Sequence, residues 1–196
     1  EEGYVRGNTF LHPKLDITFT VPQGFVIDNS AAAVTAAGPG DIAVRFDGVS
    51  VGRGTRLDDY IRSGWVTGLD PSSVRPATIN GNEAVVARAA SEGWQFDVTV
   101  IRAGGQVYRL LTAAPLSSHE LENVARSVSG SFRLLTPAER SSLKPLKVRV
   151  VTVAAGQNIA SMAAMMHGVD KALDLFRVLN GLGPGADVSA GEKVKI

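Results

Sequence analysis

The chain has 196 residues, of which 44% are hydrophobic and 20% are charged, and its formal net charge is +1. This balance excludes an intrinsically disordered chain, which needs a lower apolar content or a large net charge. No run of about 18 uncharged apolar residues occurs, so we expect no membrane-spanning segment. Because the sequence has no cysteine, a disulfide scaffold, a zinc ribbon and a thiol nucleophile are excluded.

Charge divides the chain into two parts. Residues 1–143 carry 13 basic and 15 acidic side chains, whereas residues 144–196 carry 7 and 4. Between them, residues 136–146 are typical of a linker, in which Thr136-Pro137-Ala138-Glu139 is expected to cap one short helical turn. We therefore predict two domains, at 1–140 and 146–196.

Hydrophobic alternation in the first part predicts a β-rich fold with a few helices. Strands are predicted at 17–21, 25–27, 42–46, 76–79, 84–87, 94–101 and 107–111. The Asn80-Gly81-Asn82 segment is a strong signal for a tight β-hairpin. Helical spacing predicts one helix from Leu57 to Trp65 and another from Ser118 to Ser129, capped by Ser117 or Ser118. An antiparallel meander with packed helices is an α+β fold.

No arrangement of residues in the sequence has the spacing of a catalytic or metal-binding motif. The three histidines, His12, His119 and His167, are far apart, and no His-Glu-x-x-His motif is present. Asp58 and Asp59 are adjacent on a predicted helix, so their side chains point in different directions. We therefore predict no catalytic residue, no metal site and no cofactor in this chain.

Aromatic and basic residues do not indicate a ligand site either. Trp65 and Trp94 are in phase with apolar stripes, and we interpret both as core residues. The second part has a surplus of three positive charges and one aromatic residue, Phe176. Nucleic-acid binding usually needs a dense basic stripe interleaved with aromatics, so we expect no nucleic-acid partner.

Two segments of the first part resemble PsbP-like domains. They are Phe19-Thr20-Val21-Pro22-Gln23-Gly24-Phe25 and Ile79-Asn80-Gly81-Asn82-Glu83-Ala84, and the order of predicted elements over 10–135 agrees with them. The resemblance implies a non-catalytic α/β/α sandwich built on an antiparallel sheet. Such domains usually serve as docking or accessory modules.

The second part is predicted to be a small strand–helix–helix–strand unit. Strands are expected at 148–153 and 191–196, and Asn158 is expected to cap the first helix. The second helix is expected to end at Asn180-Gly181. The apolar faces of the two helices are formed by Ile159, Met162, Ala163 and Met166, and by Ala172, Leu175, Phe176 and Leu179.

This second part resembles a LysM domain. The resemblance is carried by Val151–Val153, Gly156, Ile159–Ala163, Leu179–Leu182 and Ala190–Ile196. LysM modules bind glycans that contain N-acetylglucosamine, such as peptidoglycan. The resemblance implies a groove lined by Gly156, Gln157, Asn158 and Ile159 from one loop and by Asn180, Gly181 and Leu182 from another.

The sequence also departs from the LysM pattern. Gln157-Asn158 stands where the family usually has Asp-Thr, and Val150 or Val151 replaces a common aromatic residue in the first strand. The alternative interpretation is therefore a LysM-like unit that binds no glycan and only packs against its neighbour.

Together, the two parts resemble the C-terminal, non-catalytic region of BepA-like periplasmic zinc metalloproteases. Gly7–Pro13 and Lys147–Val153 add to this resemblance. It implies an exported parent protein at the periplasm or cell envelope, with zinc held only in a catalytic domain outside this sequence. We expect the chain to target or position that peptidase near peptidoglycan. The alternative is a protein-docking module without glycan binding, which recognises a protease substrate or an envelope assembly partner.

Asn158 and Asn180 are expected to play separable roles. As a helix cap, Asn158 should tolerate Asp, which keeps a side-chain oxygen acceptor. Asn180 should tolerate Asp if it only ends a helix, so we expect Asn180→Asp to leave the melting temperature nearly unchanged. If the Asn180 amide contacts the sugar, the same change should weaken glycan binding, because Asp replaces two donors with a charge.

Overall fold

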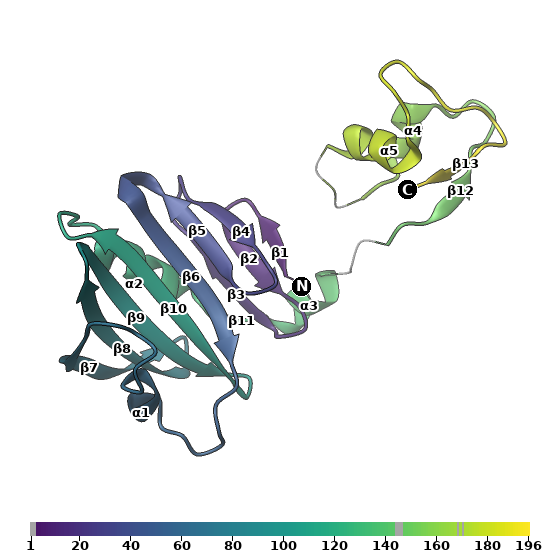
Figure 1. Cartoon of the computed structure of the whole chain (residues 1–196). Helices are drawn as coiled ribbons and strands as arrows, with labels where there is room; N and C mark the ends of the chain where they lie inside the picture. Colours follow the sequence, from purple (N-terminus) through teal and green to yellow (C-terminus); the bar gives the residue numbers. More distant parts are fainter. Residues whose placement is uncertain (1–2, 144–146, 168, 170) are drawn as a thin grey trace. The chain divides into compact units, whose positions relative to one another are not determined.

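The computed structural model describes residues 3–143, 147–167, 169 and 171–196. The chain forms two compact units, Glu1–Leu143 (unit 1) and Lys144–Ile196 (unit 2) (Figure 1). The last part of the predicted linker, 144–146, lies outside the described residues. No helix in the described part of the chain is long and apolar enough to cross a bilayer.

Unit 1 is built on a seven-stranded antiparallel sheet. Its strands, in spatial order, are β4 (Val26–Asn29), β5 (Val34–Gly38), β6 (Ile42–Val49), β10 (Gln106–Pro115), β9 (Trp94–Ala103), β8 (Asn82–Ser91) and β7 (Leu69–Ile79). Each predicted strand overlaps a strand of this sheet or of the smaller sheet of the unit, and most of the observed strands are longer than the alternation alone indicates. Figure 1 shows the long central strands β6, β10 and β9 crossing the unit side by side.

A smaller sheet and several helices complete unit 1. The sheet has the order β1 (Tyr4–Arg6), β2 (Thr9–His12), β3 (Ile17–Thr20) and β11 (Arg133–Leu134). The helices are α1 (Leu57–Ile61), α2 (Leu121–Ser131), α3 (Pro137–Ser142) and the short 3₁₀ turn η1 (Pro39–Asp41). Helix α2 packs against β3, β9 and β10, whereas α1 packs against β7, β8 and β9. The unit is therefore α+β, as predicted.

Aromatic side chains fill the space between the two sheets. The rings of Phe46 and Tyr108 stack with centroids 5.5 Å apart, and Phe19 lies 4.8 Å from Phe46. Phe10 and Phe132 complete this cluster, and α2 closes it with apolar residues of one helical stripe. Each buried aromatic side chain contributes about 1.5–3 kcal/mol through removal of its surface from water.

The opposite face of the large sheet has its own, smaller apolar cluster. Leu57 and Ile61 of α1 pack there on Val85, Val98 and Val100. These sheet residues alternate along their strands with residues of the aromatic core, because successive side chains of a strand point to opposite faces. The large sheet thus has two distinct faces, and only part of the second is covered by α1 and the loop around it.

Tight turns fix the register of the central strands. The predicted hairpin at Asn80-Gly81 is confirmed, with φ of +48° and +79° at its two central residues. Glu92-Gly93 and Gly104-Gly105 form equivalent turns between β8 and β9 and between β9 and β10. Positive φ at both positions gives the twist that a two-residue hairpin needs.

Two helix predictions need correction. The helix predicted from Leu57 to Trp65 ends at Ile61, because Ser63 bonds to the Tyr60 carbonyl and Gly64 adopts a φ of +92°. The predicted caps Ser117 and Ser118 do not cap α2, since its N-cap is Glu120. The predicted Thr136–Glu139 cap is confirmed as a capping box at the start of α3.

Unit 2 contains β12 (Val150–Thr152), α4 (Ile159–Ala164), α5 (Ala172–Asn180) and β13 (Lys193–Lys195). The two strands pair antiparallel, with Val151 opposite Val194. Both helices contribute to one apolar cluster whose buried members are Val153, Met162, Ala163, Phe176, Val188, Val194 and Ile196. The predicted cap at Asn158 is confirmed, and Gly181 ends α5 with a φ of +63°.

Gly68 lies in the loop between α1 and β7, and it tests how closely this loop approaches the large sheet. A Cβ atom at this position would lie 2.1 Å from the carbonyl oxygen of Ala90, and the residue has a φ of +73°. We expect Gly68→Ala to destabilise unit 1 by clearly more than backbone strain alone, which costs about 1–2 kcal/mol. Gly105→Ala is the matched control, because Gly105 has a φ of +79° and open space around it.

Urea unfolding followed by tryptophan fluorescence measures this difference. Both tryptophans, Trp65 and Trp94, belong to unit 1, so the signal does not report on unit 2. Equal losses of unfolding free energy in the two variants would contradict the close approach of Gly68 to Ala90.

Candidate functional site

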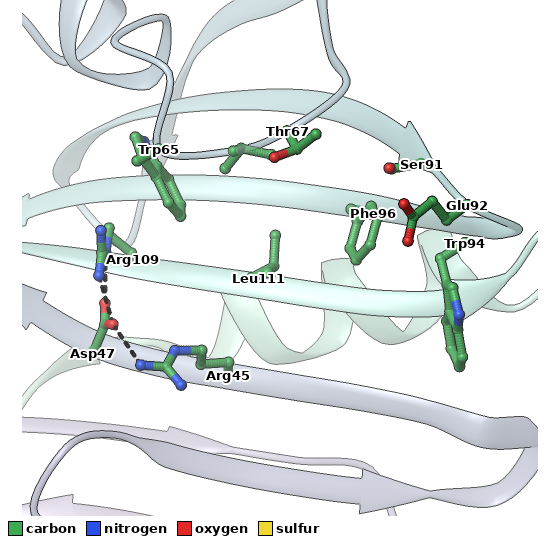
Figure 2. Close-up of a pocket in the computed structure, with 11 residues that line it drawn as sticks. Arg45, Asp47, Trp65, Thr67, Ser91, Glu92, Trp94, Phe96, Arg109 and Leu111 are labelled. Atoms are coloured by element: carbon green, nitrogen blue, oxygen red, sulfur yellow. Dashed lines mark hydrogen bonds and ion pairs between the residues drawn. The ribbon is translucent and has the colours of Figure 1, made fainter.

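A pocket of about 430 Å³ lies on the face of the large sheet opposite α2 (Figure 2). Its lining comes from β6, β9 and β10, the β8–β9 hairpin and the loop after α1. The lining residues are Arg45, Asp47, Trp65, Val66, Thr67, Ser91, Glu92, Trp94, Phe96, Arg109 and Leu111. Ligand pockets usually have volumes of about 300–1,000 Å³, so this pocket is large enough for a small ligand.

An ion pair between neighbouring strands forms one end of the pocket. Asp47 of β6 and Arg109 of β10 are direct cross-strand partners. The Nε and Nη2 groups of Arg109 each donate to one carboxylate oxygen of Asp47 at 2.6 Å. Such a bidentate pair has fixed geometry and is stronger than a neutral hydrogen bond.

Arg109 also holds α1 and the loop after it. Its Nη1 group donates to the Tyr60 hydroxyl at 3.2 Å, and its guanidinium lies 4.6 Å from the centre of a Trp65 ring. The hydrogen bond to Asp47 raises the pKa of Arg109 above its usual value, so the side chain stays charged. A charged guanidinium over an aromatic face is attracted by the ring electrons. Arg109 therefore joins β6, β10 and the Trp65 wall of the pocket.

The tryptophans differ from their predicted role. Trp65 is half-buried and packs on the apolar cluster of the second face, in part as predicted, but its indole N–H is buried without a partner among the described residues. Trp94 is 39% exposed and lines the pocket, so its assignment to the core is wrong. Trp94 opens β9 directly after a two-residue turn, where a large side chain can remain partly uncovered.

The first of the two loops predicted to bind glycan is held by its own side chains. Gln157 accepts a hydrogen bond from the Ala154 N–H at 2.7 Å, and Asn158 accepts one from the Ser161 N–H at 2.9 Å. Gly156 is exposed with a φ of +84°. The backbone N–H of Ile159 donates to Asp187 at 2.6 Å. Backbone hydrogen bonds from Ile159 and Val188 lower the pKa of Asp187.

Asn180, in the second loop, is bonded to the backbone on two sides. Its amide nitrogen donates to the carbonyls of Phe176 and Lys195, both at 2.9 Å, and its oxygen accepts from the Lys195 N–H at 2.7 Å. Asn180 thus joins the end of α5 to β13, and it does more than end a helix. These contacts replace the expectation that Asn180→Asp leaves stability unchanged with a prediction that it destabilises unit 2.

The remaining predicted residues of the second loop are Gly181 and Leu182. Gly181 is exposed and supplies the left-handed residue that ends α5. Leu182 is half-buried against the same apolar cluster as Ile159 of the first loop. The structure therefore brings both predicted loops onto one core, with their side-chain amides largely engaged in internal hydrogen bonds.

Asp58, one of the two adjacent carboxylates considered from the sequence, is paired with a basic side chain. Asp58 forms an ion pair at 3.2 Å with Arg62, which follows it by four residues. Within the described ranges, no group of three His, Cys, Asp or Glu side chains is placed to hold a metal ion.

Sequence reasoning missed the charged end of the pocket. Asp47 and Arg109 are 62 positions apart, and no local motif connects them. One feature of the sequence does indicate this end of the pocket. In β6, Arg45 and Asp47 alternate with the apolar residues of the aromatic core, so both side chains lie on the opposite face of the sheet.

No model of a protein family matches the chain, and no curated protein matches it. Several solved structures do, at low sequence identity. A protein from Bacteroides thetaiotaomicron is 10% identical with a TM-score of 0.48, over 77% of this chain and 55% of that one. A Pseudomonas aeruginosa protein of unknown function is 13% identical with a TM-score of 0.30, over 51% of this chain and 78% of that one. This chain thus spans about half the length of the Bacteroides protein.

A further similar structure is cyanobacterial PsbP (CyanoP) from Synechocystis. It is 10% identical with a TM-score of 0.50, and the match covers 64% of this chain and 91% of that one. Unit 2 holds only about a quarter of the residues, so most of this match lies on unit 1. At this identity the likeness concerns the fold alone, and it supports the predicted PsbP-like fold.

Removal of the Asp47 carboxylate tests the ion pair of the pocket. Asp47→Ala leaves Arg109 without its main partner, and we expect the unfolding free energy of unit 1 to fall by about 1–3 kcal/mol. Asp28→Ala is the control, because Asp28 is exposed on β4 of the same sheet. Urea unfolding with tryptophan fluorescence compares them, and equal effects would show that the pair does not stabilise unit 1.

Asn180→Asp tests the link between α5 and β13. The carboxylate cannot donate to the Phe176 and Lys195 carbonyls, so we expect unit 2 to lose about 1–3 kcal/mol of stability. Asn158→Asp is the matched control, since Asn158 acts in its cap as an acceptor. Hydrogen exchange at the Ile196 amide, which donates to the Arg149 carbonyl, reports on unit 2 without involving residue 180. Unchanged protection there in Asn180→Asp would contradict this role.

Proposed function

We propose that the chain is a non-catalytic binding segment in which unit 2 is a LysM-like module for glycans containing N-acetylglucosamine, such as peptidoglycan. The observation that carries this proposal is the order β12, α4, α5, β13, with its terminal strands paired antiparallel. The packing of Ile159 and Leu182 on one apolar cluster also supports it, because it anchors both candidate loops to the same core.

The internal hydrogen bonds indicate which groups remain for a ligand. Asn158 uses its side-chain oxygen in the helix cap, and within the described residues its amide nitrogen is left to donate. Gly156 and Gly181 are exposed, so the backbone of both loops is accessible. An acetamido group offers one acceptor and one donor, which suit an amide N–H and a backbone carbonyl. Asn180 is proposed to shape the groove without contacting the sugar.

We further propose that the chain belongs to an exported zinc-dependent peptidase and positions it at the cell envelope. This proposal rests on the resemblance to BepA-like proteases over both units, and the PsbP-like fold of unit 1 is consistent with it. Zinc and peptide hydrolysis would belong to a catalytic domain outside this sequence.

Sedimentation with insoluble peptidoglycan tests the glycan proposal. We expect the intact chain to co-sediment, whereas Glu1–Leu143, which contains the complete core of unit 1, stays in the supernatant. Gln157→Glu keeps the acceptor for the Ala154 N–H and adds a charge to the loop, so we expect it to weaken binding. Gln23→Glu makes the same change at an exposed site of unit 1 and serves as the control.

Two results would contradict the glycan proposal. The first is an intact chain that stays in the supernatant, and the second is equal retention of the intact chain and Glu1–Leu143. Either result would favour the second candidate function, a docking module that binds its partner through unit 1. The partly exposed Trp94 beside the unit 1 pocket favours that alternative.

A further inference from the structure

The charged end of the unit 1 pocket has a surplus positive charge. Arg45, Asp47 and Arg109 together carry a net charge of +1. Asp47 engages Arg109 through both oxygens at 2.6 Å, whereas Arg45 approaches it only at 3.5 Å. The Arg45 side chain is 52% exposed, so most of its N–H groups face the open part of the pocket or solvent. A guanidinium in this position can pair with one further anionic group.

The opposite end of the pocket carries a negative charge. Glu92 lies in the turn between β8 and β9 with a φ of +51°. In Figure 2, Glu92 lies at the same end of the pocket as Trp94, away from Asp47 and Arg109. A ligand with a second anionic group would be repelled there, so the pocket favours a ligand with one negative charge at the Arg45 end.

The space between the charged ends is apolar. Leu111 and Phe96 project from the sheet as the floor, and Trp65 and Trp94 stand at its two ends in Figure 2. Leu111 is the cross-strand partner of Arg45, so the apolar floor begins directly beside the Arg45 guanidinium. Aromatic side chains bury a large area with little loss of conformational freedom, which suits them to hold an apolar group.

We propose that this pocket binds an apolar group that carries a single carboxylate. Arg45 pairs with the carboxylate, and the apolar body lies over Leu111 and Phe96 between the two tryptophans. The Asp47–Arg109 pair stays intact and positions the Trp65 wall. The C-terminal residue of a peptide and a free amphipathic acid share this chemistry. This binding is independent of the glycan site proposed for unit 2.

Titration of the full chain with three tryptophan-free probes tests this assignment. They are N-acetyl-Ala-Ala-Leu with a free carboxylate, the same peptide as its C-terminal amide, and 4-phenylbutyrate. Calorimetry measures affinity, and the fluorescence of Trp65 and Trp94 reports occupancy of unit 1 alone. We expect the free-acid peptide, the phenylbutyrate or both to bind, and the amide to bind at least about tenfold more weakly.

Charge variants test the orientation of the ligand. Arg45→Gln should weaken binding of the carboxylate probes about tenfold, whereas Glu92→Gln should leave it unchanged or tighten it about twofold at low salt. Arg126→Gln is the control, because it removes the same charge from an exposed position on α2, which packs on the other face of the sheet. Circular dichroism checks that each variant is folded.

The outcomes distinguish a peptide C-terminus from a free amphipathic acid as the ligand, and some of them would overturn the proposal. Binding of the peptide without phenylbutyrate assigns a peptide C-terminus, and binding of phenylbutyrate without the peptide assigns a free acid. Equal affinity for the acid and the amide, or equal effects of Arg45→Gln and Arg126→Gln, would contradict recognition of a carboxylate. Failure of both acids to bind at millimolar concentration would overturn the proposal while leaving the glycan proposal for unit 2 untouched.

Discussion

The alternation of side chains along β10 determines what each face of the large sheet can do. Tyr108 and Leu110 point into the aromatic core, and Arg109 and Leu111 therefore point to the other face. A slip of one residue would bury Arg109 among phenylalanines and expose Tyr108, so the register is strongly specified. The tight turn at Gly104-Gly105 and the cross-strand Asp47–Arg109 pair both agree with this register. The core and the pocket are consequences of the same pairing.

The two units use their polar side chains in different ways. In unit 1, the Asp47–Arg109 pair is part of an open pocket, and Arg45 beside it keeps most of its hydrogen-bonding capacity. In unit 2, Gln157 closes its own loop by accepting from the Ala154 N–H, and Asn180 joins α5 to β13. Glycan recognition by unit 2 would therefore depend on the shape and backbone of its loops, which these amides stabilise, more than on direct contacts from the amides.

Features controlled by local chemistry could be predicted from the sequence. The Asn80-Gly81 hairpin, the Thr136 capping box and the Asn158 cap each depend on a few adjacent residues, and all three are confirmed. The α+β class followed from the alternation of the longer strands. Strand β5 was missed because Val34–Gly38 is rich in alanine and glycine, which have low β-propensity and form a strand here through pairing with β6.

Features controlled by distant pairing could not be predicted in this way. Asp47 and Arg109 meet only because β6 and β10 are neighbours in the sheet, and this order is not encoded in either segment alone. The role of Asn180 likewise depends on Lys195, 15 residues later. The phase of Trp94 predicts a core position, but phase does not show whether any element covers that face.

We propose that the two units carry separate binding sites of different chemistry. Nuclear magnetic resonance of the isotope-labelled full chain tests it most directly, because the indole N–H signals of Trp65 and Trp94 report on the unit 1 pocket. An apolar carboxylate should shift these two signals, and an oligomer of N-acetylglucosamine should shift backbone signals of residues 156–159 and 180–182 alone. Shifts of the same signals by both ligands, or no shift of the indole signals by any carboxylate, would contradict the account.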